Sequence, residues 1–320
     1  MRYVTVGATG LTLSRLAFGC APVMGKVGRS AALRAMHLAC DHGVTHFDVA
    51  RSYGFGEAES ILGEFAQGRR DQITIATKFG IAAVPNAGLL RLVKPLARAA
   101  MKRIPLLRNY ARAASRQVLA RGRYDLAAAQ ASFEQSLRQL RTDYVDLLFI
   151  HEPTPQDVLT DELLVWLEKL RARGHICAWG LATRREWTAH HYAAMAVKPR
   201  FVQCEFNVEA CEPFGGPLAD VPAIHHSPFG GPDGMEALRP ALAARLGATA
   251  VRKLSREDFG RLLLEFAVHA NDAHPVLCSM FSPHHIGHNV EAVTRPRFLA
   301  EIAALQRSGW TEPGARARPA

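Results

Sequence analysis

Short apolar runs recur along the chain, and stretches with apolar residues spaced three and four apart separate many of them. The runs predict strands at residues 16–19, 45–48, 74–77, 146–150, 176–181, 201–205, 224–226 and 276–279. The intervening helical patterns include residues 31–40, 57–65, 126–140 and 161–173. Eight strands that alternate with helices favour an α/β protein with a closed (β/α)8 TIM barrel.

The ends of the chain and two irregular stretches modify this picture. Residues 3–13 predict a β-hairpin that caps the barrel bottom, with its turn at 7–10. A long insertion at 81–124 follows the third strand, where prolines separate helical pieces. Residues 207–223 hold too many glycines and prolines for a full helix, so we expect the sixth helix to be short or missing. We interpret 1–307 as one barrel domain and 308–320 as a disordered tail.

The positive charge is concentrated in the insertion. The net charge is +10, and residues 81–124 contain ten basic side chains and no acidic one. The remainder of the chain is therefore balanced, which argues against a protein that coats nucleic acid. Basic residues recur every four positions at 94–102 and 108–116, which predicts amphipathic helices. The segment would serve either as a lid on the barrel or as a binding surface for an anionic substrate, a partner or a membrane surface.

Other features of the composition indicate a soluble cytoplasmic protein. No apolar run approaches the roughly 18 residues of a membrane span, and the N-terminus lacks the apolar stretch of a signal peptide. The six cysteines are scattered and include no Cys-x-x-Cys pair. We therefore expect reduced thiols in the core rather than disulfides or a structural zinc site.

Four polar residues stand at or just beyond the ends of predicted strands, namely Asp48, Tyr53, Lys78 and His151. Because the carboxyl ends of barrel strands share one face, we expect these side chains to meet there. Asp48 and Lys78 would form a buried ion pair. The ammonium would lower the pKa of Tyr53 from about 10 and make it a proton donor, and His151 would orient and polarise a substrate carbonyl.

The same segments resemble the aldo-keto reductase superfamily. The likeness runs from the N-terminal hairpin to about Asn289, and its most specific parts are residues 47–54 (FDVARSYG), 57–59 (EAE), 76–80 (ATKFG) and 136–151. The resemblance implies transfer of a hydride between a nicotinamide cofactor and a small carbonyl or alcohol substrate. It also implies that Tyr53 is the general acid and base, Lys78 tunes its pKa, Asp48 positions Lys78 and His151 orients the carbonyl. The sequence from Asp48 to Glu59 and the positions of the four candidates resemble those of sugar dehydrogenases in the family. This resemblance suggests a hydroxylated or cyclic substrate.

The resemblance further implies a set of cofactor-binding residues. They are Thr183, Gln203, His226, Ser227, Ser279, Ser282, His285 and Asn289. Gln203 would bind the nicotinamide carboxamide, and His226 would stack on its ring in place of the more common tyrosine. Residues 182–183 read Ala-Thr where the family has Ser-Asn. Ser279 and His285 replace the Lys and Arg of NADP-dependent members, so we expect NAD(H) to be used at least as well as NADP(H).

Three other functions compete with this interpretation. His284 and His288 lie four residues apart, a spacing that suits zinc, but the sequence offers neither the intervening glutamate nor a third ligand, so we predict no metal site. A metal-dependent barrel hydrolase or isomerase would need several carboxylates and histidines at strand ends. Here one strand end supplies Lys78 and another supplies His151 beside a tyrosine, which favours hydride chemistry. A barrel that binds the cofactor but acts as a scaffold or regulatory subunit remains the alternative.

Overall fold

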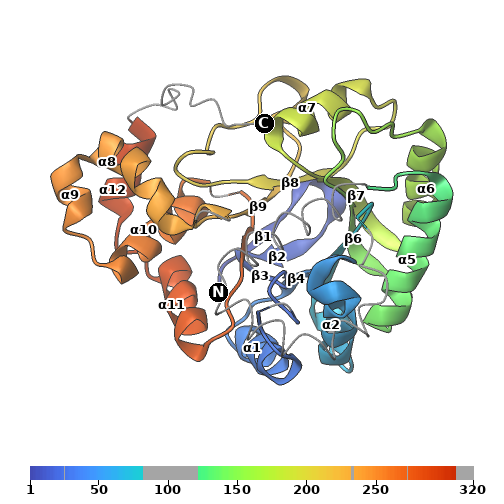
Figure 1. Cartoon of the computed structure of the whole chain (residues 1–320), viewed down its shortest axis with the longest axis horizontal. Coiled ribbons are helices and arrows are strands. Elements are labelled where there is room, and N and C mark those ends of the chain that lie inside the picture. The colour runs from blue at the N-terminus through green and yellow to red at the C-terminus, as the bar shows by residue number, and fades with distance from the viewer. Residues whose placement is uncertain (25, 82–121, 232–233, 272, 308–320) are drawn as a thin grey trace, which may run out of the picture. The chain divides into compact units, whose positions relative to one another are not determined.

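The computed structural model in Figure 1 describes residues 1–24, 26–81, 122–231, 234–271 and 273–307. Its eight parallel strands form a closed barrel in the order β10-β3-β4-β5-β6-β7-β8-β9, which confirms the predicted (β/α)8 class. The barrel strands are β3 (Leu16–Gly19), β4 (His46–Asp48), β5 (Thr74–Phe79), β6 (Val145–His151), β7 (Ile176–Ala182), β8 (Phe201–Glu205), β9 (Ala223–His226) and β10 (Val276–Cys278).

The N-terminal hairpin is also present. Strands β1 (Tyr3–Thr5) and β2 (Thr12–Ser14) pair antiparallel, and the 3-10 turn η1 (Gly7–Thr9) lies between them. Gly7 has φ 55°, and a Cβ there would lie 2.5 Å from the ring of Pro222. A larger residue would therefore be strained both by its backbone and by this contact.

Helices separate many of the strands along the sequence. They are α1 (Arg29–Asp41), α2 (Ala58–Ala66), α5 (Leu126–Leu140), α6 (Asp161–Ala172), α7 (Arg185–Ala194), α8 (Arg239–Leu246), α9 (Ala248–Arg252), α10 (Arg256–His269), α11 (Pro283–Thr294) and α12 (Leu299–Arg307). Further 3-10 turns are η2 (Tyr53–Gly56), η3 (Arg70–Gln72), η4 (Gly216–Leu218) and η6 (Met235–Leu238). Between β8 and β9, where every residue is described, η4 is the only helical turn. The prediction that the sixth helix is short or missing is thus confirmed.

Side-chain caps fix where several helices begin. Asp125 accepts the amide of Ala128 at 2.9 Å before α5, and Ser255 accepts the amide of Asp258 at 3.0 Å before α10. Such caps satisfy backbone donors that have no partner in the first turn. They explain why the structure starts α5 at Leu126, as the sequence predicts.

The described residues divide into two compact units. Unit 1 comprises Met1–Gly19, Ala35–His46 and the chain from Arg200, and unit 2 comprises Cys20–Arg34 and Phe47–Pro199. In unit 1, helices α8, α9, α10 and α12 pack together, coloured orange to red in Figure 1. In unit 2, α2 packs beside α5. The assignment of residues 1–307 to one domain stays a prediction.

The central strands of unit 2 are buried along their length. Every residue of β6 is buried, and its parallel register sets Phe149 beside Lys78 of β5 and His151 beside Ala182 of β7. At the start of β6, Asp146 accepts the Arg70 guanidinium and the Ile75 amide, each at 2.8 Å. This fixed register brings Lys78 and His151 to the same ends of neighbouring strands.

Two stretches named in the sequence analysis lie outside the described residues, namely most of the basic insertion (82–121) and the tail (308–320). The described residues that flank the insertion are joined, because the Arg123 amide donates to the Gly80 carbonyl at 2.9 Å. No helix in the described ranges is long and apolar enough to cross a membrane.

The cysteines depart in part from the expected core positions. All six are free, and Cys20, Cys204, Cys211 and Cys278 are buried. Cys177, however, is exposed although it belongs to β7. It is the one residue of β7 whose side chain is not buried, so the apolar run around it did not reveal which face it takes.

A half-buried histidine in unit 1 is expected to make the stability sensitive to acid. Burial, assisted by the nearby Arg15 guanidinium, lowers the pKa of His274 from 6.5 to about 4. The Arg15 side chain is itself buried and donates to the His274 carbonyl at 2.6 Å. In the folded protein His274 therefore stays neutral at a pH where the unfolded chain binds a proton at this residue.

We predict that the free energy of unfolding falls as the pH drops from 6.5 through 4, because the pKa of His274 is depressed to about 4 in the folded state. The full shift corresponds to at most about 3 kcal/mol. Urea unfolding at several pH values should show a weaker pH dependence in His274→Asn than in the parent, and His42→Asn, at an exposed position, is the control. Equal pH dependence in the parent and His274→Asn would contradict this assignment.

Candidate active site

A buried ion pair forms the centre of the candidate site in unit 2. Asp48 is the last residue of β4, and Lys78 lies near the end of β5. The Lys78 Nζ atom lies 2.5 Å from Asp48 Oδ1 and 3.1 Å from the Val49 carbonyl oxygen. Only 1% and 4% of the Lys78 and Asp48 side chains are exposed. The two charges therefore compensate each other in the interior, as the sequence predicts.

Tyr53 and His151 complete the group of four. Tyr53 begins η2, five residues after the last residue of β4, and its side chain is hydrogen-bonded to that of Lys78. The Lys78 Nζ atom is 5.1 Å from the centre of the Tyr53 ring. The Tyr53 and His151 rings meet edge to face, with centroids 6.1 Å apart. The structure thus brings together all four residues that the sequence singled out.

The net pKa shift of Tyr53 differs from the expectation. Burial raises the pKa of Tyr53 above its ordinary value, and the Lys78 ammonium opposes this only in part. The lysine acts in the predicted direction, but the loss of hydration has the larger effect. For Lys78, burial lowers the pKa, yet the nearby Asp48 carboxylate and Tyr53 raise its net value. Lys78 therefore stays protonated beside Tyr53.

The segment after β3 encloses the ion pair from within unit 2. The Cys20 amide donates to the Asp48 carbonyl at 2.9 Å. A Cβ on Gly54, which has φ 59°, would lie 2.4 Å from the Val23 carbonyl oxygen, so only glycine allows this approach next to Tyr53. Burial and the Asp48 carboxylate raise the pKa of Cys20, which makes this thiol a packing group rather than a nucleophile.

Tyr124, which the sequence analysis did not single out, holds the backbone of His151. Its hydroxyl donates to the His151 carbonyl at 2.8 Å. Its ring also covers Gly80, where a Cβ would lie 2.4 Å from the Tyr124 ring. Tyr124 is the last residue of the insertion, so no local pattern links it to the strand end that it contacts. The position of Gly80 two residues after Lys78 was the available signal.

The nicotinamide-binding candidates on β8 and β9 belong to unit 1. Gln203 is buried in the middle of β8. His226 ends β9, and its Nδ1 lies 2.9 Å from the Ser227 hydroxyl. Ser227 has φ 56°, and its carbonyl accepts the Asn207 amide at 3.2 Å. A buried amide within β8 and a half-buried imidazole at the end of β9 are suitable groups for a carboxamide and a flat aromatic ring.

The adenosine-binding candidates cluster at the start of α11. Ser282 caps this helix by accepting the His285 amide at 3.2 Å, and the Ser279 hydroxyl donates to the Gly19 carbonyl at 3.1 Å. Asn289 is buried, with its amide 3.9 Å from the Met280 sulfur. A helix N-terminus with serines is a suitable donor set for the phosphates of a dinucleotide. Taken with Gln203 and His226, these residues fit a nicotinamide dinucleotide.

Thr183 is the one cofactor candidate that lies in unit 2. Its side chain is buried, and its hydroxyl donates to the Pro153 carbonyl at 3.1 Å. The hydroxyl proton is therefore engaged with the backbone, which leaves Thr183 as an acceptor for a further partner.

The two histidines with metal-like spacing stack instead of converging. The rings of His284 and His288 are nearly parallel, with centroids 5.9 Å apart. Their Nε2 atoms lie 3.8 and 3.4 Å from Glu257 Oε1. Within the described ranges, no group of three or more His, Cys, Asp or Glu side chains has the geometry to hold a metal ion.

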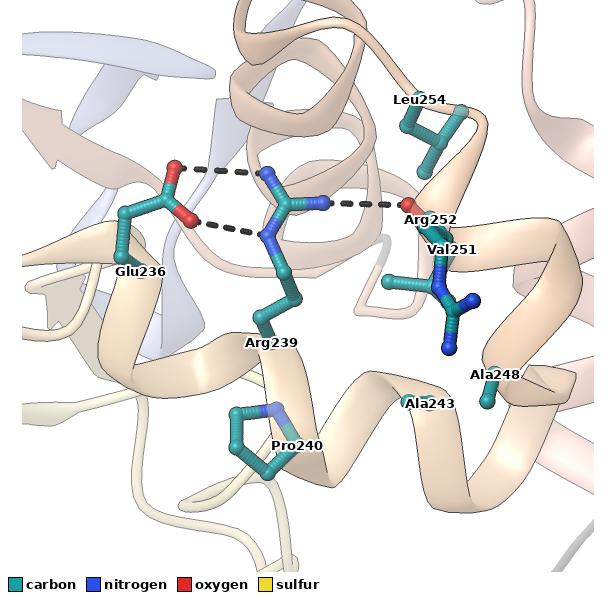
Figure 2. Close-up of a pocket in the computed structure, with 8 residues that line it drawn as sticks. All are labelled: Glu236, Arg239, Pro240, Ala243, Ala248, Val251, Arg252 and Leu254. Atoms are coloured by element: carbon teal, nitrogen blue, oxygen red, sulfur yellow. Dashed lines mark hydrogen bonds and ion pairs between the residues drawn. The ribbon is translucent and has the colours of Figure 1, made fainter.

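A surface pocket on α8 and α9 is lined by none of the predicted cofactor residues. Figure 2 shows the residues that line it, which are Glu236, Arg239, Pro240, Ala243, Ala248, Val251, Arg252 and Leu254. Arg239 is already engaged, because it donates to Glu236 at 2.8 Å and to the Val251 carbonyl at 3.0 Å. Neither the four catalytic candidates nor the predicted adenosine-binding residues line this pocket.

Comparison with known sequences places these features in a family. A sequence model described as the Aldo/keto reductase family matches residues 15–213. The 6-dehydroglucose reductase of Agrobacterium fabrum strain C58 is 32% identical over 240 residues, which cover 69% of this chain and 69% of that protein. The aldo-keto reductase YhdN of Bacillus subtilis is 28% identical over 188 residues. That match covers 57% of this chain and only about half (47%) of the relative.

Solved structures share the fold across the chain. An aldo-keto reductase from Klebsiella pneumoniae, crystallised with NADPH, superposes with a TM-score of 0.68 at 20% identity. The superposition covers 99% of both chains. At 20% identity, this similarity shows a shared fold and nothing further.

Proposed function

Because the chain belongs to the aldo/keto reductase family, we propose that it is a nicotinamide-dependent oxidoreductase that interconverts a carbonyl and an alcohol, with Tyr53 as the general acid and base. One observation carries this proposal: a buried Asp48–Lys78 ion pair whose ammonium is hydrogen-bonded to Tyr53, with His151 against the Tyr53 ring. A structural ion pair alone would not require a tyrosine and a histidine beside it.

The residues divide the chemistry among them. The bound dinucleotide supplies or accepts the hydride. Tyr53 donates its phenolic proton to the substrate oxygen in reduction and takes a proton back in oxidation. Lys78 stabilises the phenolate that this transfer leaves, and Asp48 holds Lys78 through the 2.5 Å contact. His151 donates to the substrate oxygen and so orients the carbonyl and stabilises its developing charge.

We assign cofactor binding to the residues that the family resemblance implies. Gln203 would hold the carboxamide, and His226 would stack on the nicotinamide ring while Ser227 fixes the His226 imidazole through the 2.9 Å contact. Thr183 would accept from the carboxamide. The set Ser279, Ser282, His285 and Asn289 would bind the adenosine end.

For the substrate, we propose a polyhydroxylated or cyclic carbonyl compound and its alcohol. The 32% identity to a 6-dehydroglucose reductase supports this class. Glu152 adds a chemical reason, because it directly follows His151 with φ 53° and its side chain is exposed. A carboxylate at this position can accept hydrogen bonds from substrate hydroxyl groups.

The experiment that tests the function is a binding titration followed by a turnover assay. The protein is titrated with NADH and NADPH while its tryptophan fluorescence is followed, and it is then assayed with sugar-derived and simple carbonyls and alcohols. Cofactor binding with turnover supports the enzyme. Binding without turnover of any substrate would favour the scaffold or regulatory role, and no binding would contradict both.

We predict that NADH is used at least as well as NADPH. Ser279 and His285 offer a 2'-phosphate no permanent positive charge. The Glu257 carboxylate of α10 lies 3.4 Å from His288, which is on α11 with His285. A dianionic phosphate is bound best by arginine or lysine. His285→Arg should therefore tighten NADPH binding relative to NADH. A parent kcat/KM for NADPH more than about tenfold above that for NADH would contradict the prediction.

A further inference from the structure

A buried carboxylate on α2 joins the two segments that carry Tyr53 and Lys78. Glu59 is only 1% exposed. Its Oε1 accepts the Thr77 hydroxyl at 2.7 Å, and its Oε2 pairs with the Arg51 guanidinium at 2.5 Å. Thr77 directly precedes Lys78 on β5, and Arg51 stands two residues before Tyr53.

Both bridges are shielded from water, which makes them strong and geometrically restrictive. Thr77 is fully buried, and only 13% of the Arg51 side chain is exposed. A buried carboxylate is tolerated only where donors compensate for its lost hydration, and Glu59 has one donor on each oxygen. Movement of either segment would therefore leave a buried charge with a missing partner.

Backbone hydrogen bonds between β4 and β5 link the Tyr53 segment to the Lys78 strand less firmly than the Glu59 bridges do. Beyond β4 the chain bonds to β5 through the Val49 amide, which donates to the Ala76 carbonyl at 2.9 Å. Tyr53 lies four residues further on, in the short turn η2, where the Tyr53 amide bonds back to the Ala50 carbonyl. Together with the Lys78 contacts to the Val49 carbonyl and the Tyr53 side chain, the Glu59 bridges tie the turn before Tyr53 to the strand that bears Lys78.

We propose that Glu59 is a positioning residue for catalysis, which sets the distance between the Tyr53 hydroxyl and the Lys78 ammonium through Arg51 on one side and Thr77 on the other. This inference rests on the proposed function of Tyr53 and Lys78. If the bridge to Thr77 is lost, Lys78 stabilises the Tyr53 phenolate less well. The pKa of Tyr53 then rises further, because Lys78 is the neighbour that lowers it.

Thr77→Val gives the cleanest test, because valine has nearly the same shape and leaves the Glu59–Arg51 pair intact. We expect kcat to fall roughly tenfold with little change in KM, and the alkaline limb of the kcat profile to move to higher pH. Thr77→Ser keeps the hydroxyl, so its kcat and the alkaline limb of its kcat profile should match those of the parent. Glu59→Gln should lower kcat at least as much. Glu64→Gln, on the same helix and paired with Arg29 at the surface, is the matched control.

Hydrogen exchange provides a readout that does not depend on turnover. Exchange of amides in residues 49–57 should be faster in Thr77→Val and Glu59→Gln than in the parent, while amides of β6 exchange at the parent rate. Folded Thr77→Val and Glu59→Gln proteins with parental kcat, pH profile and exchange would overturn the positioning role. If the parent itself has no turnover, the proposed function fails, and the exchange data alone decide whether Glu59 couples the two segments.

Discussion

Tyr53→Phe should lower kcat by about a hundred- to ten-thousand-fold, which is the usual contribution of a general acid. The substitution removes the transferable proton and leaves the ring, so the edge contact with His151 is kept. It also leaves the Lys78–Asp48 pair in place, because that contact of 2.5 Å does not involve Tyr53. Stability and cofactor affinity should therefore change little. The measurements are steady-state kinetics on the best substrate and the Kd for NADH.

Tyr192→Phe is the matched control for this loss. Tyr192 is half-buried on α7, and its ring lies below Lys198, with Nζ 5.0 Å from the ring centre. It therefore offers a second lysine–tyrosine pair, without the Asp48 carboxylate. We expect parental kcat in this variant. A Tyr53→Phe enzyme that keeps near-parental kcat would refute the assignment of Tyr53 as the acid and base.

The positions of the four catalytic candidates were predictable from local sequence because each lies at or near a strand end. Asp48, Lys78 and His151 follow short apolar runs, and parallel barrel topology brings such ends to one face. The helix that begins at Leu126 was equally local, since its apolar spacing and the Asp125 cap are both contained in the sequence. The missing sixth helix followed from the glycines and prolines of 207–223.

Features that depend on distant packing escaped the sequence. The sign of the Tyr53 pKa shift depends on how completely the site is buried, to which the segment from Cys20 contributes. The Tyr124 hydroxyl contacts the His151 carbonyl, although helix α5 lies between these two residues in the sequence. Glu59 was visible in the family motif, but its two buried partners were not. Which donors reach each of its oxygens depends on the tertiary structure.

Lys78→Met should lower kcat by about a hundredfold or more, because it removes the ammonium that stabilises the Tyr53 phenolate. Burial already raises the pKa of Tyr53, and Lys78 is the neighbour that lowers it. Without the lysine the pKa of Tyr53 rises further, so any alkaline limb of the residual activity should shift to higher pH. Lys169→Met, at an exposed position of α6, is the control.

The substitution also leaves the Asp48 carboxylate buried without its partner, since only 4% of that side chain is exposed. Removal of one member of such a pair typically costs about 3–5 kcal/mol of folding free energy. The double variant Asp48→Asn/Lys78→Met removes both charges and should recover most of this stability, as measured by urea unfolding, while its kcat stays as low as that of Lys78→Met. Recovery of kcat together with stability would show that Lys78 serves the fold alone. An unchanged alkaline limb in Lys78→Met would equally contradict its coupling to Tyr53.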